Sequence, residues 1–388
     1  MFGIEVASLE QDQLRGLLHL TAGFGSFLTL LLGLRSISNH NKAPDPTLKD
    51  PSTNEENAWH QKEKLEIVEV ITETDDIKTF RFQRKGGKFF PPFTSGQFLS
   101  FQIGEDEKLL RSYSISASVT NRELLQVSVK KLPNGLGSGW FHERKIGDEV
   151  WGFPPSGLFT DSQLAQVPRV YVAGGIGITP LLSMIATNLD RVKRFPMFLF
   201  YGVRSQKDIA FHSLLSYFSE RYPNFHYHPV LGESGEGWAG KTGRISAQMI
   251  HQHAGKNIQT HYFFCGPPPM TRPIMEDLIK DGISIDQIHS EKFASPQAFD
   301  PKTIPTREVK ITYNNKIYQY NGKQTLLEFL EAQGLSPSFA CRVGVCGTCK
   351  SKTKGKVHAL TDSGLTLAER RDGLVLTCVS YPLEDVEL

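Results

Sequence analysis

The sequence has few cysteines and almost no net charge. Its 388 residues include five cysteines, and 43 Lys and Arg nearly balance 41 Asp and Glu, which leaves a formal charge of +2. This balance argues against a nucleic-acid surface built on bulk charge, so we expect no nucleic-acid partner. Four of the cysteines lie close together near the C-terminus, unlike the disulfide framework of a secreted protein. They are typical of metal ligands in a reducing compartment, which predicts a cytoplasmic protein.

Internal repeats and low-complexity tracts are also absent. With 39% hydrophobic and 22% charged residues, the chain does not have the composition of a disordered protein. At roughly 150 residues per domain, its length predicts two or three folded domains. Residues 1–64 would hold a hydrophobic segment and a polar, proline-punctuated tether, and residues 295–306, with three prolines, would form a second linker.

An uncharged run lies near the N-terminus. Residues 16–34 contain no Asp, Glu, Lys or Arg, and at about 1.5 Å per residue a helix of this length nearly reaches the ~30 Å of a bilayer core. Glycines and polar residues lower its hydrophobicity. Three interpretations therefore stay open: a membrane span, a helix lying on a membrane or a partner, and ordinary burial or disorder. Membrane association through residues 14–35, at the cytoplasmic face, is one of the expected outcomes.

Residues 65–163 consist of short alternating segments cut by Gly, Pro and Asn, the pattern of a small antiparallel barrel. One such segment carries a cation, an aromatic ring and hydroxyl groups that suit a ligand with a phosphate and a flat ring system. Some twenty residues later, a glycine-rich turn precedes a helix-like segment, so free backbone amides form an anion site for a pyrophosphate. These candidate residues are Arg111, Ser112, Tyr113 and Ser114, followed by Gly135, Leu136, Gly137 and Ser138.

The two motifs together resemble the flavin domain of the ferredoxin–NADP reductase superfamily. The resemblance implies that Arg111 holds the flavin phosphate, that Tyr113 lies against the isoalloxazine and that Ser114 forms a hydrogen bond near its N5. Residues 135–138 would cradle the pyrophosphate. We expect FAD rather than FMN, because GLGSGWFHE is more similar to the FAD-binding members than to the FMN-binding phthalate dioxygenase reductase type.

Residues 164–294 alternate apolar strands with helices, which predicts a parallel sheet that binds ligands at the carboxyl ends of its strands. The first strand runs into GGIGITP and a helix, the second into YGVRS, and a later one into CGPPPM. Glycines there let the backbone approach a pyrophosphate. The candidate cofactor-binding residues are Gly174, Gly175, Gly177, Thr179, Pro180, Arg204, Cys265, Gly266 and Pro267.

These three motifs match, in order, the nicotinamide domain of the same superfamily. The match implies that residues 174–180 flank the pyrophosphate and the nicotinamide, with Cys265 and Gly266 beside the nicotinamide where the hydride leaves for the flavin. Glu291 and Phe293 resemble the family segment that closes over the flavin, with Phe293 as a ring shield. The implied catalytic residues are Tyr113, Ser114, Cys265, Glu291 and Phe293.

The sequence gives a weaker signal for the group at the 2′-position of the coenzyme, which distinguishes NADH from NADPH. Glu233, between Gly232 and Ser234, suits a ribose diol better than a phosphate, which favours NADH. Arg204, Lys241 and Arg244 remain as partners for the phosphate of NADPH.

The C-terminal residues 307–388 contain a cysteine pattern. Cysteines at 341, 346 and 349 form C-x4-C-x2-C, and Cys378 follows from a distant strand-like segment. This is the plant-type [2Fe–2S] spacing, whereas zinc sites favour two short cysteine knuckles. The predicted metal ligands are therefore Cys341, Cys346, Cys349 and Cys378, in the β-grasp ferredoxin domain that the resemblance implies.

The expected molecule is multidomain α/β and β: a flavin-binding antiparallel barrel, a parallel α/β nicotinamide-binding domain and a ferredoxin domain. A nicotinamide gives two electrons, a [2Fe–2S] cluster takes one, and a flavin converts between the two. The domain order resembles the reductases of Rieske-type oxygenases, phenylacetyl-CoA epoxidase, desaturases and the hybrid-cluster protein. We expect an NAD(P)H-dependent oxidoreductase that passes electrons through FAD and [2Fe–2S] to such a partner. A non-catalytic electron-transfer or redox-sensing subunit is the alternative.

Overall fold

The computed structural model describes residues 59–388 except 60, 108, 234, 236, 292, 294–307, 323, 340, 341, 343, 345, 346, 361–363 and 366. The chain separates into two units, residues 1–54 and 55–388. The hydrophobic segment expected at 14–35 lies outside the described residues. Within the described part, none of the helices has both the length and the apolar character needed to cross a membrane.

An antiparallel barrel follows Trp59, as predicted. Its six strands lie in the order β4-β3-β6-β1-β2-β5, and a bridge between Ile115 and Val127 joins the two edges. Alternating apolar residues point into one core of aromatic rings, in which Phe101 and Phe141 lie edge to face at 5.0 Å. The elements are β1 (Glu63–Thr74), β2 (Ile77–Arg84), β3 (Phe98–Gln102), β4 (Leu110–Ser114), β5 (Leu125–Lys130), α3 (Leu136–His142) and β6 (Glu149–Gly152).

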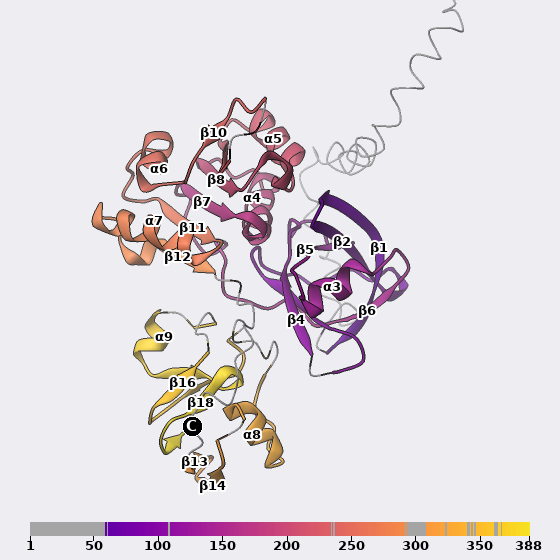
Figure 1. The fold of residues 1–388 in the computed structure, drawn as a ribbon, viewed down its shortest axis with the longest axis vertical. Coiled ribbons are helices and arrows are strands. Elements are labelled where there is room, and N and C mark those ends of the chain that lie inside the picture. The colour runs from indigo at the N-terminus through magenta and orange to yellow at the C-terminus, as the bar shows by residue number, and fades with distance from the viewer. Residues whose placement is uncertain are drawn as a thin grey trace, which may run out of the picture. The chain divides into compact units, whose positions relative to one another are not determined.

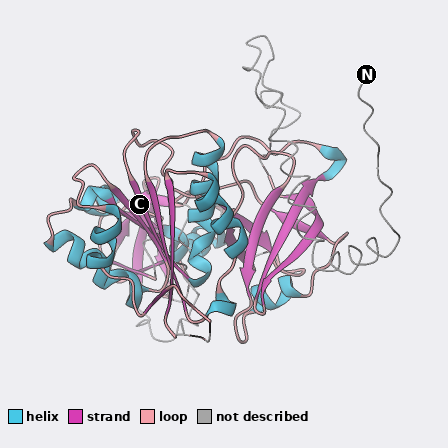
Figure 2. Ribbon diagram, turned by 90° about the horizontal axis from the view of Figure 1, so that it is seen from above, coloured by secondary structure: helices cyan, strands magenta, loops and turns pink. Residues whose placement is uncertain are grey.

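A parallel sheet forms the next domain, with strand order β10-β9-β8-β7-β11-β12. Its central strand β7 is buried at every residue, as expected of a strand covered on both faces. Helices α4 and α5 cover one face, and α6 and α7 the other (Figures 1 and 2). The strands are β7 (Arg169–Gly174), β8 (Met197–Val203), β9 (Phe225–Leu231), β10 (Lys241–Thr242), β11 (His261–Cys265) and β12 (Ile288–Glu291). The helices are α4 (Ile178–Asp190), α5 (His212–Arg221), α6 (Ala247–Ala254) and α7 (Pro268–Lys280).

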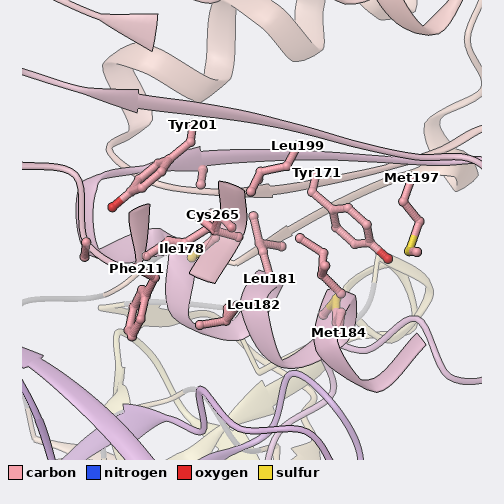
Figure 3. Close-up of a cluster of buried hydrophobic side chains, with 14 of the residues drawn as sticks. Tyr171, Ile178, Leu181, Leu182, Met184, Met197, Leu199, Tyr201, Phe211 and Cys265 are labelled. Atoms are coloured by element: carbon pink, nitrogen blue, oxygen red, sulfur yellow. The ribbon is translucent and has the colours of Figure 1, made fainter. Parts of the chain in front are cut away.

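The strand order reverses at β7. From β7 the chain proceeds through α4 to β8 on one side, whereas β11 pairs with β7 on the other. Such a switch point leaves a ligand crevice at the carboxyl ends of the two strands. Leu181 and Leu182 of α4 pack against the sheet beneath Tyr171 and Leu199 (Figure 3), which fixes the helix that starts at this crevice.

The C-terminal domain is built on a hairpin and a helix. Asn314 and Asn315 both have positive φ, the turn that joins two twisted strands most readily. Thr325 caps α8 in a reciprocal capping box with Glu328, and Phe329 packs with Ile311 in one core. The elements are β13 (Val309–Tyr313), β14 (Lys316–Tyr320), α8 (Leu326–Ala332), β15 (Lys350–Lys352), β16 (Val357–Ala359), α9 (Leu367–Arg371), β17 (Leu374–Leu376), β18 (Ser380–Pro382) and β19 (Val386–Glu387).

The three-domain fold class is thereby confirmed. The exact limits predicted above, 65–163, 164–294, 295–306 and 307–388, stay predictions.

Candidate functional site

The two motifs of the barrel meet in space. A Cβ atom at Gly137 would lie 2.5 Å from Arg111 Cγ and 3.0 Å from Tyr113 Oη, so β4 and the first turn of α3 touch where only glycine fits. The N-terminus of α3 carries no side-chain cap, which leaves its amides open to an anion. We call residues 111–114 and 135–138 the flavin site. Its uncapped amides, beside the cationic Arg111, form a cradle that fits a phosphate group.

Tyr113 is held by aromatic packing. Its ring lies edge to face on Phe141 at 5.0 Å, and burial raises the pKa of its phenol well above the usual range, so the hydroxyl stays a neutral donor. Ser112 Oγ shares a 2.9 Å hydrogen bond with Ser100 Oγ, and Ser114 is buried. The strand thus holds a fixed ring and buried hydroxyls; their roles toward a flavin stay predictions. No sequence pattern marks Phe141, because only its position on α3 brings its ring against Tyr113.

The side chain of Ser138 forms its hydrogen bonds within its own turn. Its Oγ accepts a hydrogen bond from the Leu132 N–H at 3.1 Å and donates one to Gly135 O at 3.2 Å. Leu136 directs its side chain outward and is 69% exposed. The side chain of Ser138 therefore shapes the cradle, and the backbone amides are what the turn offers a pyrophosphate.

The glycine turns after β7 and β11 touch through their backbones. A Cβ at Gly177 would lie 2.1 Å from Cys265 O, and one at Gly266 would lie 2.9 Å from Gly174 Cα. Thr179 Oγ1 donates to Ile176 O at 3.0 Å and steadies the start of α4. We call residues 174–180 and 265–267 the nicotinamide site; the contact closes the switch-point crevice with backbone, as a site for a pyrophosphate requires.

Cys265 and Glu291 lie side by side in the register of β11 and β12. Burial, with a smaller contribution from the Glu291 carboxylate, raises the pKa of the Cys265 thiol well above its usual range, so this thiol is no nucleophile. Burial also raises the pKa of Glu291 to about 8. Glu291 Oε2 is buried without a hydrogen-bond partner among the described residues, which suits a position that a ligand completes. Phe293, two residues on, is 44% exposed, and its role as a ring shield stays a prediction.

The residues proposed for coenzyme choice follow β8 and β9. Arg204 is exposed directly after β8, and the Glu233 N–H donates to its carbonyl oxygen at 2.8 Å. Lys241 and Arg244 are exposed as well. The structure thus brings Arg204 and Glu233 together at the carboxyl edge of the sheet, while Ser234 lies outside the described residues.

Two of the four predicted cluster ligands are described. The Sγ atoms of Cys349 and Cys378, 29 residues apart, lie 3.2 Å from each other, and both residues are buried. Thr377 Oγ1 donates to Cys349 O at 3.0 Å and ties the two ligand segments together. Two thiols at this separation fit a shared iron. Cys341 and Cys346 lie outside the described residues.

Comparisons with known proteins match each of these regions. Models of an oxidoreductase FAD-binding domain, an oxidoreductase NAD-binding domain and a 2Fe-2S iron-sulfur cluster binding domain match residues 64–160, 171–276 and 311–383. The glycine betaine monooxygenase reductase subunit of Pseudomonas aeruginosa is 30% identical over 343 residues, covering 83% of this chain and 93% of that protein. The chain belongs to the flavin and iron–sulfur reductases of the ferredoxin–NADP reductase superfamily.

Other relatives of the reductase agree. The ferredoxin reductase component of a 3-ketosteroid-9-alpha-monooxygenase from Mycolicibacterium smegmatis is 27% identical, over 83% of this chain and 95% of that one. Phthalate dioxygenase reductase shares the fold, with a TM-score of 0.58 at 23% identity over 84% of this chain and 97% of that one. The reductase is therefore an NAD(P)H-dependent oxidoreductase that carries electrons through FAD to a [2Fe–2S] cluster, as predicted.

Proposed function

We propose that the reductase delivers single electrons from its ferredoxin domain to a terminal oxygenase. The approach of Cys349 and Cys378 to 3.2 Å carries this proposal, because two buried thiols at this distance fit an iron of a one-electron cluster in the C-terminal domain. The names of several relatives support an oxygenase as the acceptor, among them the anthranilate 1,2-dioxygenase electron transfer component of Acinetobacter baylyi, 32% identical over 58% of this chain. A desaturase or a hybrid-cluster protein would be the other acceptors.

The residues of the barrel would bind and orient FAD. Arg111 and the amides of residues 135–138 would hold its phosphates, and Tyr113 with Ser114 would lie along the ring system. When bound, the flavin supplies the conversion of a two-electron hydride into single electrons. Cys265 and Glu291 would border the nicotinamide, and the raised pKa of Glu291 would keep a proton on its carboxyl near neutral pH. Phe293 would exclude water from that side.

The coenzyme would be NADH. The carboxylate of Glu233 follows β9, where it would accept hydrogen bonds from a ribose diol and repel a 2′-phosphate. The NADH oxidoreductase HCR of Escherichia coli, 27% identical over 84% of this chain, carries this coenzyme in its name.

Residues 14–35 would attach the reductase to the cytoplasmic face of a membrane. Fractionating cells that express the full chain or a chain lacking these residues tests this: the full chain should sediment with membranes, and the truncated chain should not. Equal distribution of the two chains would contradict it.

The electron path is tested by two acceptors. NADH should support reduction of ferricyanide, which accepts electrons at the flavin, and of cytochrome c, which draws on the cluster. A Cys346→Ser variant should keep the first activity and lose the second. Equal loss of both would overturn the order of carriers, and absence of ferricyanide reduction in the unmodified chain would favour a non-catalytic subunit. The acceptor is identified by purifying the oxygenase that re-oxidises the reduced chain.

A further inference from the structure

Helix α4 is buried on both of its sides. Of its residues, Asp190 alone is exposed, and a helix without a solvent face must be covered by two layers. One layer is its own sheet (Figure 3). The barrel provides the other, because Ile77 of β2 belongs to the same apolar cluster and a Cβ at Gly96 would lie 2.5 Å from Met184 Cε.

Two hydroxyl groups of α4 face this second layer. Ser183 and Thr187 are 0% and 3% exposed and lie one helical turn apart, so they share a face. Ser183 Oγ donates to Ala117 O at 2.7 Å, and the Val119 N–H donates to Thr187 Oγ1 at 3.1 Å. Both partners are backbone groups of the barrel.

A third bond extends the row. Thr120 Oγ1 donates to Asp190 Oδ2 at 2.7 Å, at the exposed end of the same helix. Residues 183, 187 and 190 therefore form a polar stripe with helical spacing on a helix whose other residues are mostly apolar.

The polar stripe joins the elements that carry the flavin site and the nicotinamide site. Residues 117–120 begin three positions after the end of β4, which carries Arg111 and Tyr113. The first turn of α4 belongs to the nicotinamide site. Apolar contacts are not directional, so they specify the position of the helix on the barrel less sharply than hydrogen bonds do. Hydrogen bonds weaken steeply with distance and angle, and two buried ones set a single position.

We propose that Ser183 and Thr187 are positioning residues that hold the nicotinamide site at a fixed distance from the flavin site for hydride transfer. The proposal rests on the roles given to these sites under the proposed function. Reacting atoms must approach to about 3–3.5 Å, and a misplacement of about 1 Å costs up to about 100-fold in rate. Neither residue touches the reacting atoms; both act through α4 and β4.

The test is the double variant Ser183→Ala, Thr187→Val in the full chain with its cofactors. The first change removes the hydroxyl, and the second replaces it by a methyl group of similar size. Flavin bleaching is followed by stopped flow over a range of NADH concentrations. The limiting rate should fall by about tenfold, while the NADH concentration at half-maximal rate and the bound FAD stay within twofold. Thr187→Ser should restore the rate of the Thr187→Val single variant, which a loss of general stability would not explain.

The matched control removes two hydrogen bonds that each join residues of the same domain. They run from Ser219 Oγ to Phe225 O at 3.4 Å and from Thr74 Oγ1 to Asp76 Oδ1 at 3.0 Å. Ser219→Ala, Thr74→Val should bleach at the unmodified rate. A double variant of Ser183 and Thr187 with the unmodified rate, or a control that slows equally, overturns the proposal. Failure of the role given to the flavin site would be seen separately: an Arg111→Ala chain would then keep its full FAD content.

Discussion

The carbonyl oxygen of Cys265 lies 2.1 Å from the position that a Cβ atom would occupy at Gly177. No side chain fits between two backbones at this distance, so any residue larger than glycine must push α4 away from β11. The contact makes one crevice out of two turns that are nearly ninety residues apart in the sequence.

Gly177→Ala is therefore expected to damage the nicotinamide site alone. The value of kcat/KM for NADH with ferricyanide should fall at least tenfold, because a shift of about 1 Å at a reaction site has this size of effect. The FAD content should not change. Steady-state kinetics and flavin absorbance of the purified variant check both parts, and a variant that loses its FAD would contradict the separation of the two sites.

Gly137→Ala should instead reduce FAD binding. The new methyl group would lie 2.5 Å from Arg111 Cγ and force β4 and the α3 turn apart. Flavin absorbance per protein should drop severalfold and recover only with excess FAD. Gly139→Ala is the matched control, since a Cβ at this position would meet no atom within 4 Å outside its own turn. Equal flavin loss in both variants would show that any alanine in this turn lowers FAD binding, and would contradict the role of the Gly137 contact.

The protonation of Glu291 makes stability depend on pH. Its pKa is raised from 4.5 to about 8 in the folded chain, so the folded state binds the proton more tightly than the unfolded state. This contribution is complete below about pH 4.5 and is lost as the pH rises to about 8. Thermal unfolding should show the unmodified chain losing on the order of 5 kcal/mol over that window relative to Glu291→Gln, which mimics the protonated acid. Parallel curves for the two proteins would exclude a protonated Glu291.

Glu233→Arg should change the coenzyme preference. Replacing a carboxylate by a guanidinium removes repulsion of a 2′-phosphate and adds a charged hydrogen-bond donor. The ratio of kcat/KM for NADPH to that for NADH should rise by at least about tenfold, the equivalent of one charge-assisted hydrogen bond. Ferricyanide assays with each coenzyme measure it, and Glu220→Arg, an exposed position on α5, serves as the charge control. An unchanged ratio would place coenzyme choice elsewhere.

The sequence by itself determined the chemistry of this reductase. The run from Cys341 to Cys349, the Arg111 to Ser114 segment and the glycine turns after β7 and β11 are local patterns. Each carries its meaning within a dozen residues, because backbone geometry and ligand spacing are local properties. The order of these patterns along the chain, with the family resemblance that they carry, was enough to predict the domains, FAD, the cluster and the electron path.

Only the tertiary structure decided which residues touch. Cys378 reaches Cys349 and Gly137 reaches Arg111 through packing between segments far apart in sequence. The hydroxyl of Ser138 forms its hydrogen bond within its own turn. Ser183 and Thr187, on a mostly apolar helix, form hydrogen bonds to the backbone of the barrel. No local pattern contains these contacts, because burial and hydrogen-bond partners are set by how completed elements pack, and a side chain's role follows from the partner it finds there.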